Sequence, residues 1–378
     1  MNRYVQALLF IYLSFLVSTA QAEHSLPMTE DKSAYQTHVI WPDIIIPWGL
    51  VQLPDGKILA TERSGKLWLL TEGKPSIEIT GLPEIHAYGQ GGLLDIALHP
   101  DFANNQIIYF TYASQYTHNN KIASNTALMR AKLDINNHQL IEHKQLYQGE
   151  GDSNKGQHYG SRIAVTDQFV YFSIGDRGQR DKNPQNLSLD GGKIYRLNLD
   201  GSIPTANPFY QQAKAKKAIY SYGHRNPQGL MILANTNQLW SHEHGPRGGD
   251  EVNLIEAGKN YGWPVIGYGI NYIGTNYTDI TEKPGMEQPK LYWDPSIAPS
   301  GMAYVSSDKY PQWQGKVLLG GMKYGHLVLL EINNNRVLKQ TKLLAGIGRV
   351  RNVIQGNDGY IYLGIDGKGI LRLLPQDS

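Results

Sequence analysis

Short runs of alternating apolar and polar residues, separated by turn residues, recur along most of the chain. Residues 49–70, GLVQLPDGKILATERSGKLWLL, read as three strands joined by a PDG turn and a glycine turn. Residues 351–375, RNVIQGNDGYIYLGIDGKGILRLLP, repeat this layout. Val, Ile, Leu and Tyr alternating with polar residues are typical of strands that bury one face. The pattern predicts an all-β protein.

Looser copies of this unit lie between these two segments. They begin near Leu93, Ile163, Gly229 and Gly301, which makes six units in all. Spread over the chain that follows residue 22, six units give roughly 60 residues each, more than the ~40–50 residues of compact propeller repeats. Long inserted loops would explain the excess. We therefore predict a six-bladed β-propeller.

The ends of the chain suggest how such a ring would close. Residues 76–82, SIEITGL, supply a fourth strand after the first unit, whereas the last unit ends without one. Residues 35–41, YQTHVIW, could provide that strand from the N-terminal side, which would leave no long open sheet edge. Because no linker interrupts the pattern, we expect one domain over residues 23–378. Residues 205–218, TANPFYQQAKAKKA, are expected to form a surface loop with one helical turn.

The first 22 residues read as a secretory signal. Arg3 is their only charge, an apolar run spans 7–17, and Ala20-Gln21-Ala22 fits a small-x-small cleavage pattern. The apolar run is shorter than the ~20 residues of a membrane span, so an uncleaved anchor is the weaker alternative. We expect a soluble, exported protein without stable membrane insertion, most simply in a bacterial periplasm.

Composition narrows the classes of partner. The formal net charge is +2, and charged residues make up 18% of the chain. This balance gives no support for nucleic acid or an anionic membrane as a partner. The sequence has no cysteine, which excludes disulfides and a lipid-modified N-terminal cysteine. Composition therefore leaves small molecules as the class of ligand to consider.

Unusual polar residues fall in the joints between the predicted strands, where a propeller binds ligands at the mouth of its channel. They are Gln90, His158, Asp176, Arg225, Asn226, Lys323, Arg349 and Arg351. Taken singly, a histidine near a strand end is more often structural, and an arginine is usually a solvated charge. Gathered on one rim, four cations, one histidine and one aspartate describe a pocket for a polyanionic ligand beside a base.

Residues 239–264, LWSHEHGPRGGDEVNLIEAGKNYGWP, are too rich in glycine and proline for a helix over much of their length. His242 and His244 would point to the same face of a strand, so zinc is one possibility. Zinc sites generally need three or four His, Cys or carboxylate ligands, however, and no further His-rich motif completes the set.

Calcium is the other candidate for this stretch, because it takes six to eight oxygen ligands and accepts backbone carbonyls. Gly245 and Pro246 can present carbonyls without bulky side chains in the way. Glu251 and the turn at Tyr261 offer further oxygen ligands nearby. The residues favour calcium over zinc, and a long loop with ordinary turn carbonyls remains an alternative.

The motifs taken together resemble the soluble quinoprotein sugar dehydrogenases of the glucose/sorbosone dehydrogenase family. GQGGLL…HPDF, HYGSR, IGDRG, GHRNPQGL, HGPRGGDEVNLI…GKNYGWP, APSG and RVRNV occur in the family's order, from about residue 45 to 375. The resemblance implies a six-bladed propeller that binds pyrroloquinoline quinone and calcium and oxidises aldose sugars at the anomeric carbon. It also implies an external electron acceptor, a quinone or a redox protein.

The resemblance also implies roles for individual residues. Lys323, Arg349 and Arg351 match the clamp that holds the three carboxylates of the cofactor. The further cofactor contacts that it implies are Gln90, Arg225, Asn226, Tyr272 and Ser296.

His158 matches the general base that takes the proton from the C1 hydroxyl while a hydride passes to the quinone and a lactone forms. Asp176 matches the partner that orients the imidazole. Arg225 would stabilise negative charge developing on the quinone oxygen.

Two calcium sites follow from the same resemblance. The carbonyls of Gly245 and Pro246 match ligands of the ion that polarises the quinone, and Glu251 and Tyr261 match a second, structural ion. An acidic ligand expected after Tyr261 is Asn271 here, which would weaken or remove one contact.

The segment Asp294-Pro295-Ser296 replaces a tryptophan-containing one of the glucose-type members. Both departures indicate the broad-specificity aldose sugar dehydrogenase branch, which implies a monomer that acts on small-molecule sugars. Two other classes remain open: a calcium-dependent propeller lactonase and a non-catalytic sugar- or protein-binding propeller. The predicted Lys/Arg clamp argues against the first, and the pairing of His158 with Asp176 argues against the second.

Overall fold

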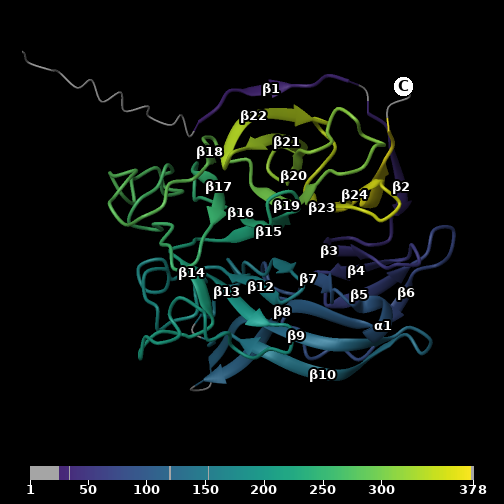
Figure 1. Ribbon diagram of the computed structural model, residues 1–378, viewed down its shortest axis with the longest axis horizontal. Helices are drawn as coiled ribbons and strands as arrows, with labels where there is room; N and C mark the ends of the chain where they lie inside the picture. The colour runs from purple at the N-terminus through teal and green to yellow at the C-terminus, as the bar shows by residue number, and fades with distance from the viewer. Residues whose placement is uncertain (1–24, 34, 119–120, 152, 376–378) are drawn as a thin grey trace, which may run out of the picture.

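The computed structural model describes residues 25–375 except 34, 119–120 and 152. The predicted signal sequence therefore lies outside the described residues. Six β-sheets surround a central axis, and the first strand of each repeat unit lies innermost (Figure 1). The predicted six-bladed β-propeller is confirmed.

The first three blades follow the chain order without exception. Blade 1 consists of β3 (Pro47–Gln52), β4 (Ile58–Glu62), β5 (Lys66–Leu70) and β6 (Ile77–Ile79). Blade 2 consists of β7 (Leu93–Leu98), β8 (Ile107–His118), β9 (Lys121–Asp134) and β10 (Gln139–Gln148). Blade 3 consists of β11 (Ile163–Val165), β12 (Phe169–Ile174), β13 (Lys193–Asn198) and β14 (Ile219–Tyr222).

The other three blades include the two strands that precede blade 1 in the sequence. Blade 4 consists of β15 (Pro227–Leu233), β16 (Gln238–Glu243), β17 (Asp250–Ile255) and β18 (Leu291–Trp293). Blade 5 consists of β19 (Pro299–Tyr304), β20 (Val317–Gly321), β21 (His326–Asn333), β22 (Arg336–Leu343) and β1 (Met28–Glu30). Blade 6 consists of β23 (Val350–Gln355), β24 (Ile361–Ile365), β25 (Gly369–Leu373) and β2 (Thr37–Trp41).

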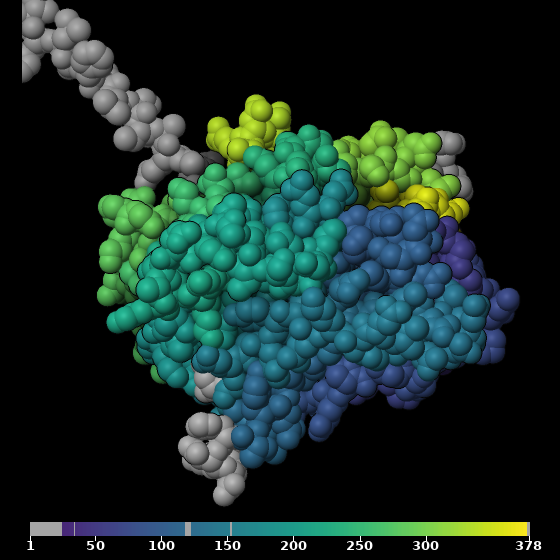
Figure 2. Space-filling model, turned by 60° about the horizontal axis from the view of Figure 1, so that its bottom comes forward, coloured from purple at the N-terminus to yellow at the C-terminus, as the bar shows by residue number. Residues whose placement is uncertain are grey.

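The N-terminal strand β2 closes the ring as predicted. It pairs antiparallel with β25, with Thr37 opposite Leu373. Yellow C-terminal residues accordingly lie next to purple N-terminal ones at one edge of the molecule in Figure 2. The sequence analysis missed β1, which adds a parallel strand to β22. The helical turn expected in 205–218 was wrong, because this stretch contains only turns and the α-helix of the described chain is α1 (Phe102–Asn105).

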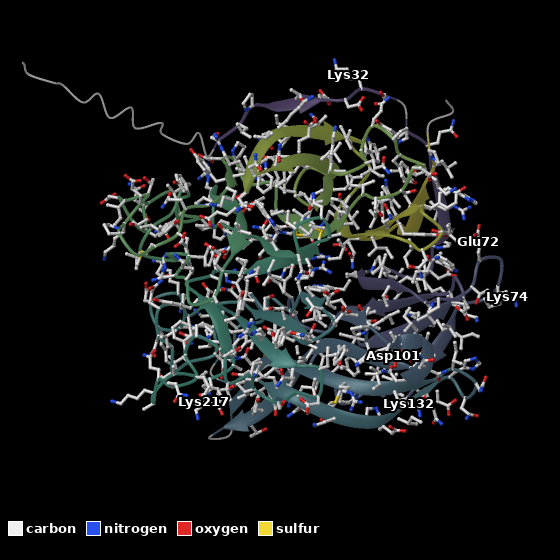
Figure 3. All side chains as sticks on the ribbon, in the orientation of Figure 1. Lys32, Glu72, Lys74, Asp101, Lys132 and Lys217 are labelled. Atoms are coloured by element: carbon white, nitrogen blue, oxygen red, sulfur yellow. The ribbon has the colours of Figure 1, made fainter. Side chains whose placement is uncertain are left out.

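Apolar layers between neighbouring sheets form the core. Blades 1 and 2, for example, share a cluster that includes Leu59, Leu69, Ile96 and Phe110, each at most 4% exposed. Burial of such side chains stabilises each by roughly 1.5–3 kcal/mol relative to exposure. Charged side chains such as Lys74 project from the outer edge of the ring (Figure 3). Neighbouring blades are therefore held together by the apolar side chains that each strand directs towards the adjacent sheet.

Arg162, at the N-terminal end of β11, fills the centre of the ring and is 3% exposed. Its guanidinium contacts all five other blades through hydrogen bonds of 2.7–3.4 Å. The acceptors are Gln228 O, Trp48 O, Asp95 Oδ1, Ser300 Oγ and Arg351 O. Asp95 supplies the compensating charge at 3.1 Å.

Loops that precede the innermost strands carry six of the predicted site residues, namely Gln90, His158, Arg225, Asn226, Ser296 and Arg349. In five blades the register of the innermost strand shifts near its beginning, as between Pro227 and Gly229 in β15. A β-bulge bends its strand and redirects the adjacent side chains. Gly229 itself admits no side chain, since a Cβ there would collide with the ring of His242. This end of the ring therefore has a fixed, irregular backbone.

Candidate active site

Three adjoining cavities contain most of the predicted site residues. The histidine cavity, of about 380 Å³, is lined by His158, Asp176 and Arg225 among others. The arginine cavity, of about 250 Å³, is lined by residues that include Gln90, Asn226, Arg349 and Arg351. A smaller space, the glutamate cavity, is lined by residues that include Glu251, Gly245, Pro246 and Tyr261. Arg225 and His244 each line two of these cavities, which places all three side by side.

His158 and Asp176 form the hydrogen bond that the sequence predicted. His158 Nδ1 lies 2.7 Å from Asp176 Oδ1. The same carboxylate accepts from the backbone N–H of Gly178 at 2.7 Å and from Trp263 Nε1 at 2.9 Å. Asp176 is 1% exposed, and these three donors fix its carboxylate. An imidazole that donates from Nδ1 keeps Nε2 as its acceptor.

The electrostatic surroundings favour a neutral imidazole beside an ionised carboxylate. Burial and the positive charge of Arg225 lower the pKa of His158 below its usual 6.5, although Asp176 opposes this shift. Burial alone would raise the pKa of Asp176, but the hydrogen bond from His158, the positive charge of Arg225 and the N–H of Gly178 contribute to a net lowering of this pKa. At neutral pH, His158 can therefore accept a proton, and Asp176 can stabilise the resulting cation.

The backbone at His158 is strained. Its φ of 54° lies in the left-handed region, which non-glycine residues adopt at a cost of about 1–3 kcal/mol. The backbone N–H of His158 donates to Gln90 Oε1 at 2.8 Å. Gly175 packs against the carbonyl of His158, where any Cβ would collide. Gln90 thus fixes the backbone that carries the imidazole, a role that the sequence did not indicate.

Arg225 lies between the histidine cavity and the glutamate cavity. Its Nη1 donates to the carbonyls of Gly245 at 2.6 Å and His244 at 2.9 Å. The neighbouring Asn226 accepts the N–H of Gly160 at 3.1 Å, which fixes its carboxamide. Arg225 is 5% exposed, so its charge acts on the cavities with little solvent screening.

The glutamate cavity contains oxygen atoms of the kind that calcium prefers. Burial and the negative charge of Glu243 raise the pKa of Glu251 to about 8, which a divalent cation would reverse. No group of three or more His, Asp or Glu side chains suited to a metal occurs in the described chain, so a calcium ion here would need backbone carbonyls. Gly245 and Pro246 line the cavity and can supply them, and the carbonyl of Gly245, which accepts from Arg225 Nη1, would have to be shared with or released by that guanidinium. These residues fit calcium.

The side chains of two residues expected to bind a metal are engaged in other hydrogen bonds. The hydroxyl of Tyr261 donates to Leu254 O at 2.6 Å, which leaves its backbone carbonyl as the available ligand. Asn271, which replaces an expected acidic ligand, accepts from Arg180 Nη1 at 2.6 Å. The carboxamide of Asn271 therefore makes a contact to a cation of the protein itself.

Zinc at His242 and His244 finds no support in the geometry. Nε2 of His242 lies 3.1 Å from Gly301 O, and Nε2 of His244 lies 2.7 Å from Pro299 O. Burial lowers the pKa of both imidazoles to about 3, so both rings are neutral and donate these bonds. The two histidines link blade 4 to blade 5.

The arginine cavity contains Arg349 and Arg351 of the predicted clamp, but it contains Arg63 in place of Lys323. Arg351 makes an ion pair of 2.6 Å with Asp366, and Arg349 makes a longer one of 3.4 Å with the same carboxylate. Arg63 lines the cavity with them, and the sequence analysis missed it. The signal was present, since Arg63 follows the second strand of blade 1 as Asp176 follows that of blade 3.

Three predicted cofactor contacts have less direct positions. Lys323 is exposed, lies 5.1 Å from the ring centre of Tyr324, and lines none of the three cavities. Ser296 is buried away from them, where its hydroxyl donates to Asp250 at 2.9 Å and accepts from Gly248 N at 3.0 Å. Tyr272 lines the histidine cavity but is 70% exposed.

A neutral histidine paired with an ionised aspartate, beside a cavity lined by arginines, is an arrangement typical of propellers that are enzymes. The family model described as Glucose / Sorbosone dehydrogenase matches residues 44–373. The chain belongs to this family, and the family expected from the sequence is confirmed. Within the described residues, no helix is long and apolar enough to cross a membrane.

Named relatives agree with this placement. An aldose sugar dehydrogenase of Escherichia coli, YliI, is 38% identical over 88% of this chain and 90% of its own length. Quinoprotein glucose dehydrogenase B of Acinetobacter calcoaceticus is 32% identical over 89% of this chain and 75% of its own length. The PQQ-bound form of an aldose sugar dehydrogenase from Streptomyces coelicolor superposes with a TM-score of 0.72 at 28% identity, over 90% of this chain and 98% of that one.

Proposed function

We propose that this protein oxidises aldose sugars at C1 to lactones, with pyrroloquinoline quinone and calcium as cofactors. The observation that carries the proposal is the 2.7 Å pair of His158 and Asp176 at the wall of a cavity that adjoins a cluster of arginines. The names of the relatives from Acinetobacter calcoaceticus and Streptomyces coelicolor support the quinone. The name of the Escherichia coli relative supports aldoses as substrates.

His158 acts as the general base. Its Nε2 accepts the proton of the C1 hydroxyl, because Nδ1 donates to Asp176. Asp176, held ionised, stabilises the imidazolium that forms. When bound, pyrroloquinoline quinone would supply the hydride acceptor, and calcium would supply a Lewis acid for its reactive carbonyl. Arg225 lines the histidine cavity and would stabilise negative charge that develops beside it.

The arginine cavity fits the carboxylates of the cofactor. Arg349 and Arg351 present planar guanidinium groups suited to bidentate pairing with carboxylates. Gln90 and Asn226 line the same cavity with neutral donors. Tyr272 lines the adjoining histidine cavity, whereas Lys323 and Ser296 line none of the three cavities and would reach the cofactor only if their present surroundings changed.

Calcium would be held by the carbonyls of Gly245 and Pro246 and, at a second position, by Glu251 with the carbonyl of Tyr261. We further propose that the protein is exported to a periplasm as a monomer after cleavage near Ala22. It would pass electrons to an external quinone or redox protein and would have no nucleic-acid partner.

The test combines purified apoprotein with pyrroloquinoline quinone, calcium, an aldose and a dye that accepts electrons. Dye reduction should require the quinone, the calcium and the aldose together. Sugar binding without dye reduction would contradict the proposal and indicate a binding protein. Hydrolysis of a lactone that needs calcium but no quinone would indicate the lactonase alternative.

A further inference from the structure

Arg63 occupies a position in the arginine cavity that no other part of the proposed mechanism uses. It follows β4 at the same end of the ring as His158 and lines the cavity together with Arg349 and Arg351. Its Nη1 donates to Gly89 O at 2.7 Å. A guanidinium has five N–H donors in a planar fork, so this bond uses only one of them.

The charges in this cavity are unbalanced. Three guanidinium groups line this cavity, and in the described part of the chain Asp366 is the carboxylate that pairs with two of them, Arg349 and Arg351. Among the described residues, no ion pair of Arg63 is found. Burial and the positive charge of Arg351 lower the pKa of Arg63, and Arg349 adds to this effect while Asp366 opposes it. An anion bound in this cavity would offset the repulsion among the three guanidinium groups.

We propose that Arg63 is a further anion-binding residue, which contacts a carboxylate of the cofactor together with Arg349 and Arg351. This inference rests on the proposed function and extends its cofactor site to blade 1. The residues of the clamp would then come from distant parts of the sequence. Arg63 lies between β4 and β5 of blade 1, whereas Arg349 and Arg351 lie at the start of β23 in blade 6.

A purely structural role is the competing explanation, because Arg63 also contacts the loop at Gly89. That loop has other attachments, however. The N–H of Gln90 donates to Gly156 O at 2.7 Å, and Gly89 packs so closely on Gly156 that a Cβ would collide. The loop therefore has a backbone contact to the next blade that does not depend on Arg63.

The test is equilibrium titration of the apoprotein with pyrroloquinoline quinone in the presence of calcium. Quenching of tryptophan fluorescence reports binding, since Trp48 lines the cavity. Arg63→Gln should weaken binding about tenfold, the order expected for one charge-assisted hydrogen bond at a partly exposed site. Arg63→Lys should recover part of the loss. Lys66→Gln, which removes a 47% exposed cation paired with Glu78, is the matched control and should bind like wild type.

The trimethyl ester of the quinone, which lacks the three carboxylate charges, distinguishes an anion-binding role of Arg63 from a structural role in the Gly89 loop. If Arg63 binds a carboxylate, wild type and Arg63→Gln should bind the uncharged ester equally. Equal loss of affinity for the acid and the ester would refute the proposal and assign Arg63 to the loop alone. Unchanged binding of the acid by Arg63→Gln would refute it as well. If the wild type itself does not bind the quinone, the proposed function fails, which is a separate outcome.

Discussion

His158 depends on two residues that lie far from it in the sequence. Asp176 fixes its ring through Nδ1, and Gln90 fixes its backbone through the N–H. Its left-handed φ of 54° is tolerated because these contacts and the close packing of Gly175 leave no relaxed alternative. A group held in this way needs little reorganisation when it accepts a proton.

Replacement of His158 by glutamine should cut the rate constant for reduction of the bound quinone by about 10²–10⁴-fold, because a positioned base contributes this much. Affinity for the cofactor should stay unchanged, since His158 lines a different cavity from Arg349 and Arg351. Single-turnover reduction, followed by the absorbance of the quinone, measures the rate. His143→Gln, on the exposed part of β10, is the control. A mutant that matches the wild-type rate would remove His158 from the mechanism.

The pH profile follows from the lowered pKa of His158. A base works only when unprotonated, so the rate should be constant above this pKa and should fall as the pH drops through it. We expect the inflection below 6.5, the usual value for histidine. Asp176 raises the pKa of His158, so Asp176→Asn should move the inflection to still lower pH and also slow the reaction. Single-turnover rates between pH 4 and 8 test this, and an inflection above 6.5 would contradict it.

At the scale of elements, the segment that joins β16 to β18 holds the proposed metal site. β16 and β17 place Glu243 opposite Glu251, so two carboxylates meet across one antiparallel pair. Two negative charges in such a position would repel each other, and burial together with this repulsion raises the pKa of Glu251 to about 8 in the absence of a cation. A calcium ion bound beside these two carboxylates would offset their repulsion, and the loop carbonyls of Gly245 and Pro246 would supply further ligands for it.

Removal of calcium should therefore lower both activity and thermal stability. Metal that binds only the folded state stabilises it by about 2.7 kcal/mol at a free concentration of 100 times Kd. Scanning calorimetry with and without a chelator measures the shift, which Glu251→Gln should reduce. Glu78→Gln, at an exposed pair with Lys66, should behave like wild type. Recovery with zinc but not with calcium would support His242 and His244 as ligands instead.

At the scale of the whole molecule, the ring is held at its rim by β2 and at its centre by Arg162. The pair of Arg162 and Asp95 is almost fully removed from solvent, with side chains 4% and 9% exposed. Burial lowers the pKa of Arg162 and raises that of Asp95, while each partner opposes the shift of the other. Removal of one partner would leave an uncompensated buried charge.

Arg162→Met should accordingly lower the free energy of unfolding by about 3–5 kcal/mol, as expected for a broken buried pair. The double variant Arg162→Met, Asp95→Asn should lose less than the sum of the single losses, because the two residues are in contact. Denaturant titration measures both. Lys132→Met, at a 40% exposed position on β9, should change stability by less than about 0.5 kcal/mol. Equal stability of Arg162→Met and wild type would contradict the central role of Arg162.

The sequence by itself determined the features that depend on local spacing. Alternation with a period of two and turns at glycine specify strands, so six units, the closing strand at 35–41 and the joints of His158 and Asp176 were all predicted. Motifs kept in order also identified the family. β1 was missed because three residues in a parallel pair leave no detectable alternation.

Only the tertiary structure decided which side chains meet. Arg162 contacts the carbonyl of Arg351, 189 residues away, and Arg63 shares a cavity with Arg349 and Arg351. Tertiary contacts also pair Ser296 with Asp250 and leave Lys323 outside the cavities. Sequence spacing specifies the face of a strand, but the angle at which each blade meets the axis determines whether a loop residue reaches the centre. That angle arises from the packing of apolar layers between all six sheets, which no single repeat encodes.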